Sequence, residues 1–328
     1  YDRAGGPYIG PDGRDWPDNP ERFAALSWVG AHLGTVGAGD WLPQILHGHD
    51  WQAGFFTEYL RAMGGSVATI LTIHNIAFTG QTSADRIPSL RLDPSRFHAE
   101  GYEYFGTVSA LKAGLMGADR LTTVSPRYAE ELMTPEFGMG LDGVMRHRRA
   151  ALSGILNGID TDTWDPATDP LIKPFADLRK KAANKAALQA ELSLPQSDGP
   201  LCVIVSRMTQ QKGLDLVLEA LPGLLKDGGQ LALLGSGDPA LEQAFMAAAQ
   251  DPNVAVRIGY DEALSHRMIA GADAILVPSR FEPCGLTQLY GLRYGTVPVV
   301  ALTGGLADTV INASPAALAT GVANGIQF

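Results

Sequence analysis

The sequence has little cysteine, little charge and no long apolar run, and each shortage argues against a class of protein. Two cysteines among 328 residues cannot build a disulfide framework, which indicates a reducing compartment. Charged residues make up only 18%, and a net charge of -10 argues against general nucleic-acid binding, which needs a basic face. No apolar run approaches the roughly 20 residues that span a bilayer, and no basic-then-apolar signal opens the chain. We therefore expect a cytoplasmic protein that binds neither nucleic acid nor membrane.

An initiator methionine is also missing. The sequence starts at Tyr1, in a stretch rich in Gly, Pro and Asp that reads as loop, and it stops abruptly at GVANGIQF. We expect a fragment that has been trimmed at both ends, so that each predicted domain is incomplete.

Strand-like and helical segments alternate along most of the chain. Apolar residues at three- and four-residue steps predict a helix over 21–34. Short apolar runs then alternate with helical segments, most clearly at 201–207, 230–238, 254–260, 273–280 and 296–305. This alternation predicts parallel sheets covered by helices. A linker-like stretch begins at Asn157, so we predict an α/β protein with two Rossmann-like domains, 1–156 and 157–328, facing across a cleft.

Polar side chains follow the predicted strands, where open α/β sheets bind their ligands. They are His47, His49 and Asp50; His74 and Asn75; Arg207 and Lys212; Gly259 and Tyr260; Arg280 and Glu282; and Thr303, Gly304 and Gly305. Because six predicted strands end in this way, we expect these side chains to lie at one edge of each sheet.

Two cations and two glycine-containing turns predict a phosphate site. Arg207 and Lys212 together suit a diphosphate, with a bidentate fork and a point charge, whereas either residue alone would be read as a surface cation. The segment Gly285, Leu286 and Thr287 opens a predicted helix directly after a strand, so its free N–H groups could hold phosphate oxygens. Thr303, Gly304 and Gly305 offer a second close approach of backbone. Ordinary turn chemistry is the alternative for both.

Glu282 is the acid best placed for chemistry on a sugar. It follows a predicted buried strand and precedes a proline, which would hold it rigidly near hydroxyls or a developing positive charge. Alternatively, it could pair with Arg280 across the turn. His74 could donate to a hydroxyl or could be a core residue with a satisfied partner. The cluster from His47 to Asp50 supplies only part of a metal site, so we expect no metal.

Seven motifs together resemble one family. HDW (49–51), HNIAFTGQ (74–81), EFGMGLDGV (136–144), NGID (157–160), SRMTQQKGLDL (206–216), PSRFEPCGLTQLYGLRYG (278–295) and TGGLADTV (303–310) resemble the bacterial glycogen synthases and the related plastid starch synthases. The resemblance runs from end to end of the chain, with the motifs in the same order.

The resemblance implies a two-domain retaining glucosyltransferase of the GT-B fold that needs no metal and no cofactor. It would move glucose from ADP-glucose to the non-reducing 4-hydroxyl of glycogen or another α-1,4-glucan. By matching motif, Arg207 and Lys212 would bind the diphosphate, with backbone amides from Gly285, Leu286 and Thr287. Tyr260 would lie against the adenine, Glu282 and His74 would hold the glucose, and Cys284 would border the donor pocket. Asp50 and Asn75 would line the acceptor side.

The sequence departs from the family at two places, and other functions stay open. Related transferases often carry a second glutamate eight residues after the first, where this chain has Tyr290. The family's Lys-x-Gly-Gly-Leu loop is absent, since no lysine precedes Lys112. An α-glucan phosphorylase would need a lysine for pyridoxal phosphate, and Lys212 is poorly suited to that role beside Arg207. A glucan- or nucleotide-binding protein without activity is the other alternative.

Overall fold

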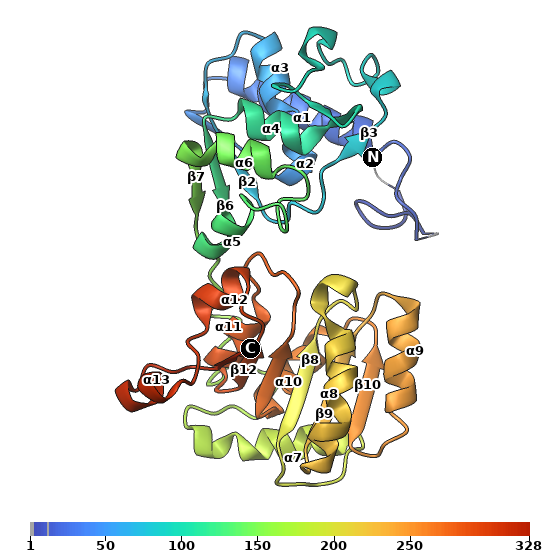
Figure 1. Cartoon of the computed structure of the whole chain (residues 1–328), viewed down its shortest axis with the longest axis vertical. Helices are drawn as coiled ribbons and strands as arrows, with labels where there is room; N and C mark the ends of the chain where they lie inside the picture. Colours follow the sequence, from blue (N-terminus) through green and yellow to red (C-terminus); the bar gives the residue numbers. More distant parts are fainter. Residues whose placement is uncertain (1–2, 12) are drawn as a thin grey trace. The chain divides into compact units, whose positions relative to one another are not determined.

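The computed structural model describes residues 3–11 and 13–328 (Figure 1). The chain divides into two compact units, Tyr1–Ile155 (unit 1) and Leu156–Phe328 (unit 2). In both units parallel strands alternate with helices, so the predicted α/β class is confirmed. No helix in the described ranges is long and apolar enough to cross a membrane.

Unit 1 contains a four-stranded parallel sheet in the order β1-β2-β6-β7. Its strands are β1 (Ile45–His49), β2 (Ala68–Ile73), β6 (Arg120–Thr123) and β7 (Leu152–Gly154). Its helices are α1 (Asn19–Val36), α2 (Asp50–Ala53), α3 (Phe56–Ala62), α4 (Ala110–Gly117), α5 (Pro126–Glu131) and α6 (Asp142–His147). The short strands β3 (Gln81–Thr82), β4 (Glu103–Tyr104) and β5 (Thr107–Ser109) form a separate antiparallel sheet.

Local sequence sets where these helices begin. Ser109 and Ser125 are the N-caps of α4 and α5, and each hydroxyl accepts a hydrogen bond from the amide three residues on. The main sheet alternates along β2: Leu71 and Ile73 are fully buried, whereas Thr72 lies on the other face and bonds to the hydroxyl of Thr122. One face of this sheet is therefore apolar core and the other carries polar side chains.

Unit 2 contains a six-stranded parallel sheet in the order β10-β9-β8-β11-β12-β13. The strands are β8 (Leu201–Val205), β9 (Gln230–Gly235), β10 (Val254–Ile258), β11 (Ala274–Val277), β12 (Val297–Val300) and β13 (Ile326–Gln327). The helices are α7 (Ala182–Glu191), α8 (Leu214–Lys226), α9 (Pro239–Ala248), α10 (Glu262–Gly271), α11 (Thr287–Arg293), α12 (Gly304–Thr309) and α13 (Pro315–Thr320).

The core of unit 2 explains why its strands are continuous apolar runs. Val203 packs into a cluster with residues of α7 and α10, while the neighbouring Cys202 and Ile204 pack into a second cluster with residues of α8 and α9. Helices therefore cover both faces, as a parallel sheet requires (Figure 1). Strand β13 was not predicted, because it is only two residues long at the end of the sequence.

The strand order of unit 2 reverses between β8 and β11. The two strands pair only at Cys202 with Ala274 and Val203 with Ile275, whereas β8 and β9 pair at five successive positions. Such a switch point leaves room for a ligand beyond the carboxyl ends of the strands.

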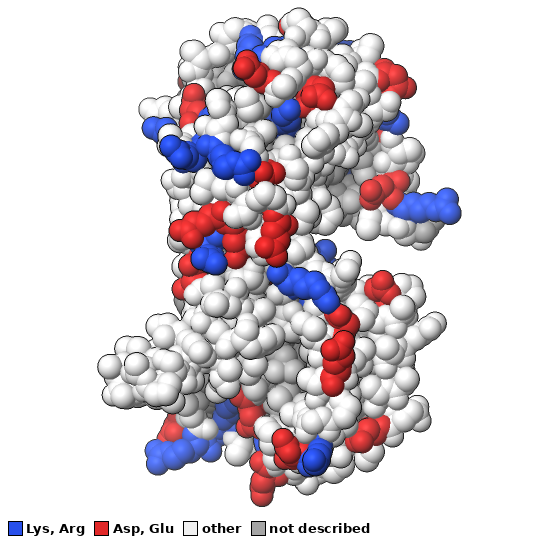
Figure 2. Space-filling view, viewed as in Figure 1, with Lys and Arg blue, Asp and Glu red and all other residues white. Residues whose placement is uncertain are grey.

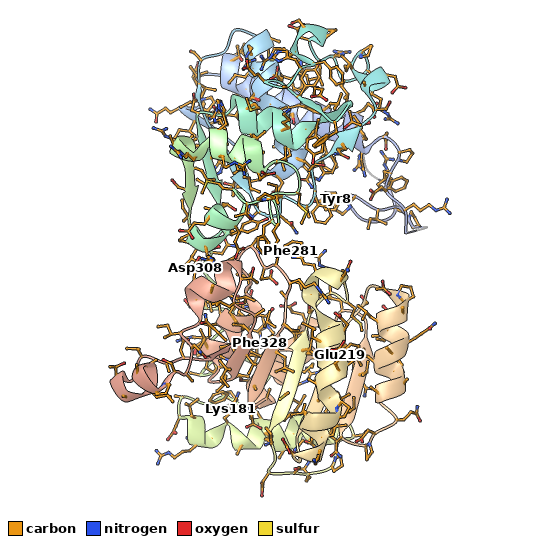
Figure 3. The ribbon with its side chains drawn as sticks, viewed as in Figure 1. Tyr8, Lys181, Glu219, Phe281, Asp308 and Phe328 are labelled. Atoms are coloured by element: carbon orange, nitrogen blue, oxygen red, sulfur yellow. The ribbon has the colours of Figure 1, made fainter. Side chains whose placement is uncertain are left out.

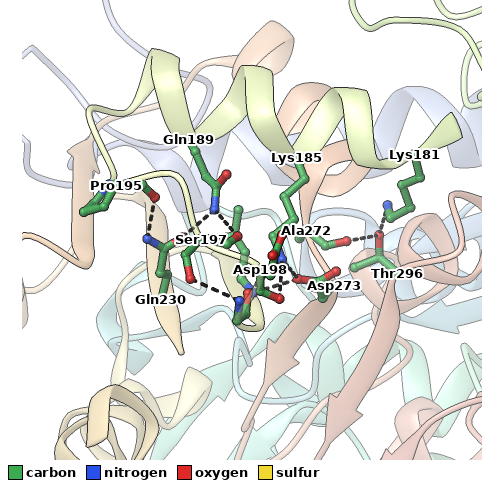
Figure 4. Close-up of polar contacts among 12 residues, drawn as sticks. Lys181, Lys185, Gln189, Pro195, Ser197, Asp198, Gln230, Ala272, Asp273 and Thr296 are labelled. Carbon is green, nitrogen blue, oxygen red and sulfur yellow. Dashed lines mark hydrogen bonds and ion pairs between the residues drawn. The ribbon is translucent and has the colours of Figure 1, made fainter. Parts of the chain in front are cut away.

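Polar side chains on and just before α7 connect this helix to the rest of unit 2 (Figure 4). Lys181, just before the helix, donates to Ile269 O at 3.1 Å, Ala270 O at 2.7 Å, Tyr294 O at 3.1 Å and Thr296 Oγ1 at 2.7 Å. Four residues on, Lys185 forms an ion pair with Asp273 at 2.7 Å. Lys181 thus satisfies carbonyls at the carboxyl ends of α10 and α11, which have no partner within their own helices.

Candidate functional site

A cavity of about 400 Å³ opens at the carboxyl ends of β8, β9 and β10 in unit 2. Arg207 and Tyr260, two of the predicted site residues, line it. The remaining lining residues are Trp164, Val205, Ser206, Leu234, Gly235, Ser236, Gly259, Asp261, Glu262, Ser265, Ile269, Thr287 and Tyr290. The structure therefore brings together residues from three predicted strand ends and from α11.

Two stacked aromatic rings, Trp164 and Tyr290, line this cavity and were not predicted from the sequence. Trp164 stacks on Tyr290 at 3.8 Å between ring centroids and on His266 at 3.7 Å. Tyr290 is the residue noted above at the position of the family's second glutamate. The WDP turn that carries Trp164 was interpreted only as linker, since no periodicity connects it with α10 or α11.

The stack rests on a buried polar network. Asp169 Oδ2 lies 2.7 Å from His266 Nδ1 and accepts a hydrogen bond from the Tyr294 hydroxyl at 2.7 Å. Burial favours the protonated carboxyl, but the hydrogen bonds from His266 and Tyr294 outweigh it and hold the pKa of Asp169 below its usual range. Because these groups satisfy one another, they fix the ring of His266 beneath Trp164.

Tyr260 lies at the mouth of the cavity and is 86% exposed. Its hydroxyl contacts the carboxylate of Glu262, which raises the pKa of the phenol. Glu262 also lies 3.7 Å from His266 Nε2. An exposed phenol ring held at its hydroxyl is a surface on which a planar base can stack.

Lys212 and Glu282, two of the predicted site residues, are in direct contact. Lys212 Nζ contacts Glu282 Oε2, and Ser279 Oγ donates to the same oxygen at 2.9 Å. Glu282 is only 6% exposed, so an unpaired carboxylate there would be costly. The lysine supplies the compensating positive charge.

Arg280 is not the partner of Glu282, so that alternative was wrong. Its guanidinium forms two hydrogen bonds with Asp215, at 2.8 and 2.6 Å, and a third with Gln210 O at 2.9 Å. Arg280 therefore ties the loop after β11 to the start of α8. Phe281, labelled in Figure 3, lies in the same loop.

The helix predicted to open at Gly285 begins later. Residues 278–286 separate β11 from α11, which starts at Thr287, so the helix does not follow the strand directly. Gly285 has φ of +73°, a conformation that favours glycine. Among the described residues, the amides of Gly285, Leu286 and Thr287 donate to no protein acceptor, which leaves them available.

The glycine pair after β12 makes its close approach to the protein itself. Gly305 N donates to Glu282 O at 3.0 Å and to Pro283 O at 3.2 Å. A Cβ at Gly305 would lie 2.3 Å from Cys284 Cα. The amide of Gly305 is thus already used within the protein. Thr303 and Gly304 form the N-cap and first residue of α12 beside it.

Cys284 is buried within this loop. Desolvation raises the pKa of its thiol, which keeps it protonated, while the backbone amide of Asn157 is its hydrogen-bond donor. A thiol in this state is a poor nucleophile.

In unit 1, Asp50 holds the backbone at the end of β2. Its Oδ1 accepts hydrogen bonds from His74 N at 2.7 Å and Asn75 N at 3.4 Å. Burial raises the pKa of Asp50, and the hydrogen bond from the backbone amide of His74 opposes that shift. Asp50 also has φ of +52°, a strained conformation for a non-glycine residue.

His74 is exposed, which argues against its interpretation as a core histidine. Its Nε2 lies 3.0 Å from His49 Nδ1, and His47 Nε2 lies 2.6 Å from Thr72 Oγ1. Within the described residues, no group of three or more His, Cys, Asp or Glu side chains is arranged to hold a metal.

The fold and the cavity define a glycosyltransferase of the GT-B class. Residues 1–147 match the family described as "Starch synthase catalytic domain", and residues 199–325 match "Glycosyl transferases group 1". The structure resembles the catalytic domain of starch synthase IV from Arabidopsis thaliana bound to ADP and acarbose. The TM-score is 0.87 at 36% identity, over 95% of this chain and 67% of that one.

Curated relatives identify the family. The chain is 66% identical over 329 residues to the glycogen synthase of Jannaschia sp. (strain CCS1) and 63% identical over 330 residues to that of Paracoccus denitrificans (strain Pd 1222). These matches cover 100% of this chain and 70% and 69% of the two relatives. The chain belongs to the glycogen synthase family, which confirms the resemblance seen in its motifs.

Proposed function

We propose that this protein transfers glucose from ADP-glucose to the non-reducing 4-hydroxyl of an α-1,4-glucan, with retention at the anomeric carbon. The observation that carries the proposal is the cavity in unit 2, where Arg207 and Tyr260 meet in a chain of the glycogen synthase family. The related Arabidopsis enzyme was solved with ADP and acarbose, which supports an adenine nucleotide and a glucan as ligands. No step of this reaction requires a metal or cofactor.

Unit 2 would bind the donor. The base would stack on Tyr260, and Arg207, at the end of β8, would bind the diphosphate together with the available amides of Gly285, Leu286 and Thr287. Cys284 would border this pocket. An arriving diphosphate would bring negative charge to Lys212, a cation that contacts Glu282.

Charge development explains why both members of the Lys212–Glu282 pair are needed. When the bond between the anomeric carbon and the phosphate oxygen breaks, its electron pair leaves with ADP and positive charge develops on the sugar ring. Lys212 and Arg207 would stabilise the departing phosphate, and the Glu282 carboxylate would stabilise the ring. The glucan 4-hydroxyl forms the new bond to the anomeric carbon, and its proton passes to an oxygen of the departing diphosphate.

Unit 1 would contribute the acceptor side. Asp50 directly follows β1, and Asn75 lies two residues after β2. His74, which directly precedes Asn75, has an exposed imidazole. In this proposal His74 donates a hydrogen bond to the transferred glucose. The strained backbone of Asp50 is consistent with a functional position, since such strain gathers at binding sites.

The test is glucose incorporation into glycogen by the complete reading frame that carries this sequence, with ADP-glucose and UDP-glucose compared side by side. Transfer from ADP-glucose is the expected result. Transfer from UDP-glucose alone would retain the reaction and overturn the donor. Binding of ADP without transfer from either donor would favour a nucleotide-binding protein without activity.

Replacing Lys212 should weaken both nucleotide binding and rate. We expect Lys212→Ala to lower kcat/KM, because the transition state loses about 2–4 kcal/mol of stabilisation. It should also weaken ADP binding, because the phosphate loses a cation. The measurement is steady-state kinetics together with calorimetric ADP titration. Lys226→Ala, an exposed lysine at the end of α8, is the matched control. An unchanged rate in Lys212→Ala would remove this lysine from the site.

A further inference from the structure

Three histidine rings gather at the carboxyl ends of β1 and β2 in unit 1. His47 and His49 are two residues apart in β1 and so share one face of the sheet, and His74 directly follows β2. The rings of His47 and His49 stack with centroids 4.3 Å apart, and the centroids of His49 and His74 are 5.2 Å apart. Only His74 has a role in the proposed function, so the other two rings call for a physical explanation.

The contact between His49 and His74 restricts both rings. His49 Nδ1 lies 3.0 Å from His74 Nε2, and a neutral imidazole donates at one nitrogen and accepts at the other. One nitrogen of the pair must therefore carry the hydrogen and the other the lone pair. When His49 Nδ1 carries the hydrogen, His74 Nε2 accepts it, and His74 Nδ1 is then the N–H that can donate to a substrate hydroxyl.

We propose that His49 is a positioning residue that fixes the tautomer and orientation of His74 during glucosyl transfer. The inference rests on the proposed function, in which His74 contacts the transferred glucose. His49 itself need not touch substrate, because it acts through the ring nitrogen of its neighbour, as outer residues do when they orient a functional histidine.

His49 is held by its own neighbours. The ring of His47 covers one of its faces, and His47 is anchored by the 2.6 Å contact of its Nε2 with Thr72 Oγ1. Thr72 Oγ1 in turn lies 2.6 Å from Thr122 Oγ1 on β6. This row of side chains crosses β1, β2 and β6, so the position of His49 depends on the register of the sheet.

The same turn holds His74 from its backbone side. Asp50, the residue after His49, accepts the hydrogen bond from His74 N at 2.7 Å. Neighbouring residues 49 and 50 thus contact the ring and the main chain of His74 respectively. Burial also lowers the pKa of His49, and His47 and His74 lower it further, which favours the neutral ring that this arrangement requires.

Two substitutions at His49 separate hydrogen bonding from ring packing. His49→Phe retains a ring that can stack on His47 but removes both nitrogens. His49→Asn loses the ring but places an amide near the position of Nδ1. We expect His49→Phe to lower kcat about 10–100-fold, and we expect His49→Asn to recover most of that loss. A role in packing alone would give the opposite order, with Phe tolerated and Asn impaired.

The assay uses the complete reading frame, with kcat for transfer and the Kd for ADP measured for each variant. ADP affinity should stay within about twofold throughout, since the nucleotide cavity belongs to unit 2. His32→Phe is the matched control, because His32 is another exposed histidine of unit 1, stacked on Trp28 at 5.2 Å. Thermal unfolding checks that all variants fold.

The outcomes distinguish this inference from the proposed function. If the unmodified protein transfers no glucose, the proposed function fails. If it transfers glucose and His74→Ala abolishes the rate, but His49→Phe matches the control, the positioning role fails alone. If His49→Phe loses rate and His49→Asn does not recover it, the nitrogen contact is not the cause and the inference is overturned.

Discussion

Glu282→Ala should abolish glucosyl transfer while leaving ADP affinity within a few fold. The carboxylate is buried, accepts from Ser279 and contacts Lys212, so its negative charge is held where the sugar ring would become positive. Losing one such preorganised group typically costs about 10²–10³ in kcat. Steady-state transfer from ADP-glucose and calorimetric titration with ADP measure the two effects separately.

The contact with Lys212 sharpens this prediction. Without the carboxylate, Lys212 has one negative partner fewer, so ADP should bind Glu282→Ala as tightly as the unmodified protein or somewhat more tightly. Glu282→Gln is the matched control, because it retains the shape and removes only the charge; its rate should be equally low. A large loss of ADP affinity in either variant would show that Glu282 serves the nucleotide and not the sugar.

Lys181→Met should destabilise unit 2 by about 2–4 kcal/mol, since it strands buried backbone acceptors. Lys181 Nζ donates to carbonyls at the ends of α10 and α11 and to Thr296, and methionine fills the space without a donor. Lys181 and Phe281 lie at opposite ends of unit 2, so catalysis should be spared at temperatures where the variant is folded (Figure 3).

Urea unfolding, followed by hydrogen exchange in peptides of unit 2, measures the loss. The matched control is Lys180→Met, because Lys180 is the adjacent lysine and is exposed. Equal stability of the two variants would show that the polar contacts of Lys181 Nζ contribute nothing net.

The stabilising effect of Lys181 should also depend on pH. Burial lowers the pKa of Lys181 to about 7 in the native state, from an ordinary value of 10.5. Between these values the unfolded chain binds a proton that the native chain does not, so stability contributed by this residue rises with pH. The difference in unfolding free energy between the unmodified protein and Lys181→Met should therefore widen from about pH 7 towards pH 10. A constant difference across that range would contradict the shift.

Strand positions could be predicted because hydrophobic patterns are local. The run LCVIV ends where β8 ends, and DAILV ends where β11 ends, so Arg207 and Glu282 were correctly placed beyond strands. Apolar continuity within each run is a property of the neighbouring residues and needs no knowledge of the rest of the fold.

Side-chain partners could not be predicted in the same way. Lys212 and Glu282 are 70 residues apart, and nothing in either motif indicates that they touch. The interpretation of Arg280 as partner of Glu282 failed because Asp215, 65 residues earlier, offers a geometry with two hydrogen bonds. Trp164 was missed for the same reason, since its stack with Tyr290 and His266 exists only after three distant segments pack.

Figure 2 adds a property of the surface that composition could not give. On the face shown, acidic and basic side chains lie in small groups separated by broad uncharged areas, with no extended basic region. The net charge of -10 is thus distributed and not gathered in one field on that face. In the proposed function, the attraction of an anionic donor would therefore come from local cations such as Arg207 and Lys212, acting at short range.

The narrow pairing of β8 with β11 has a mechanical consequence. Lys212 follows β8 and Glu282 follows β11, so the two charges stand on either side of a junction that only two registered positions join. The ladder between β8 and β9 is longer, with five registered positions. Because Arg280 bonds Gln210 O and Asp215 across the same junction, the loops beyond the strands, more than the short ladder itself, hold the ammonium against the carboxylate.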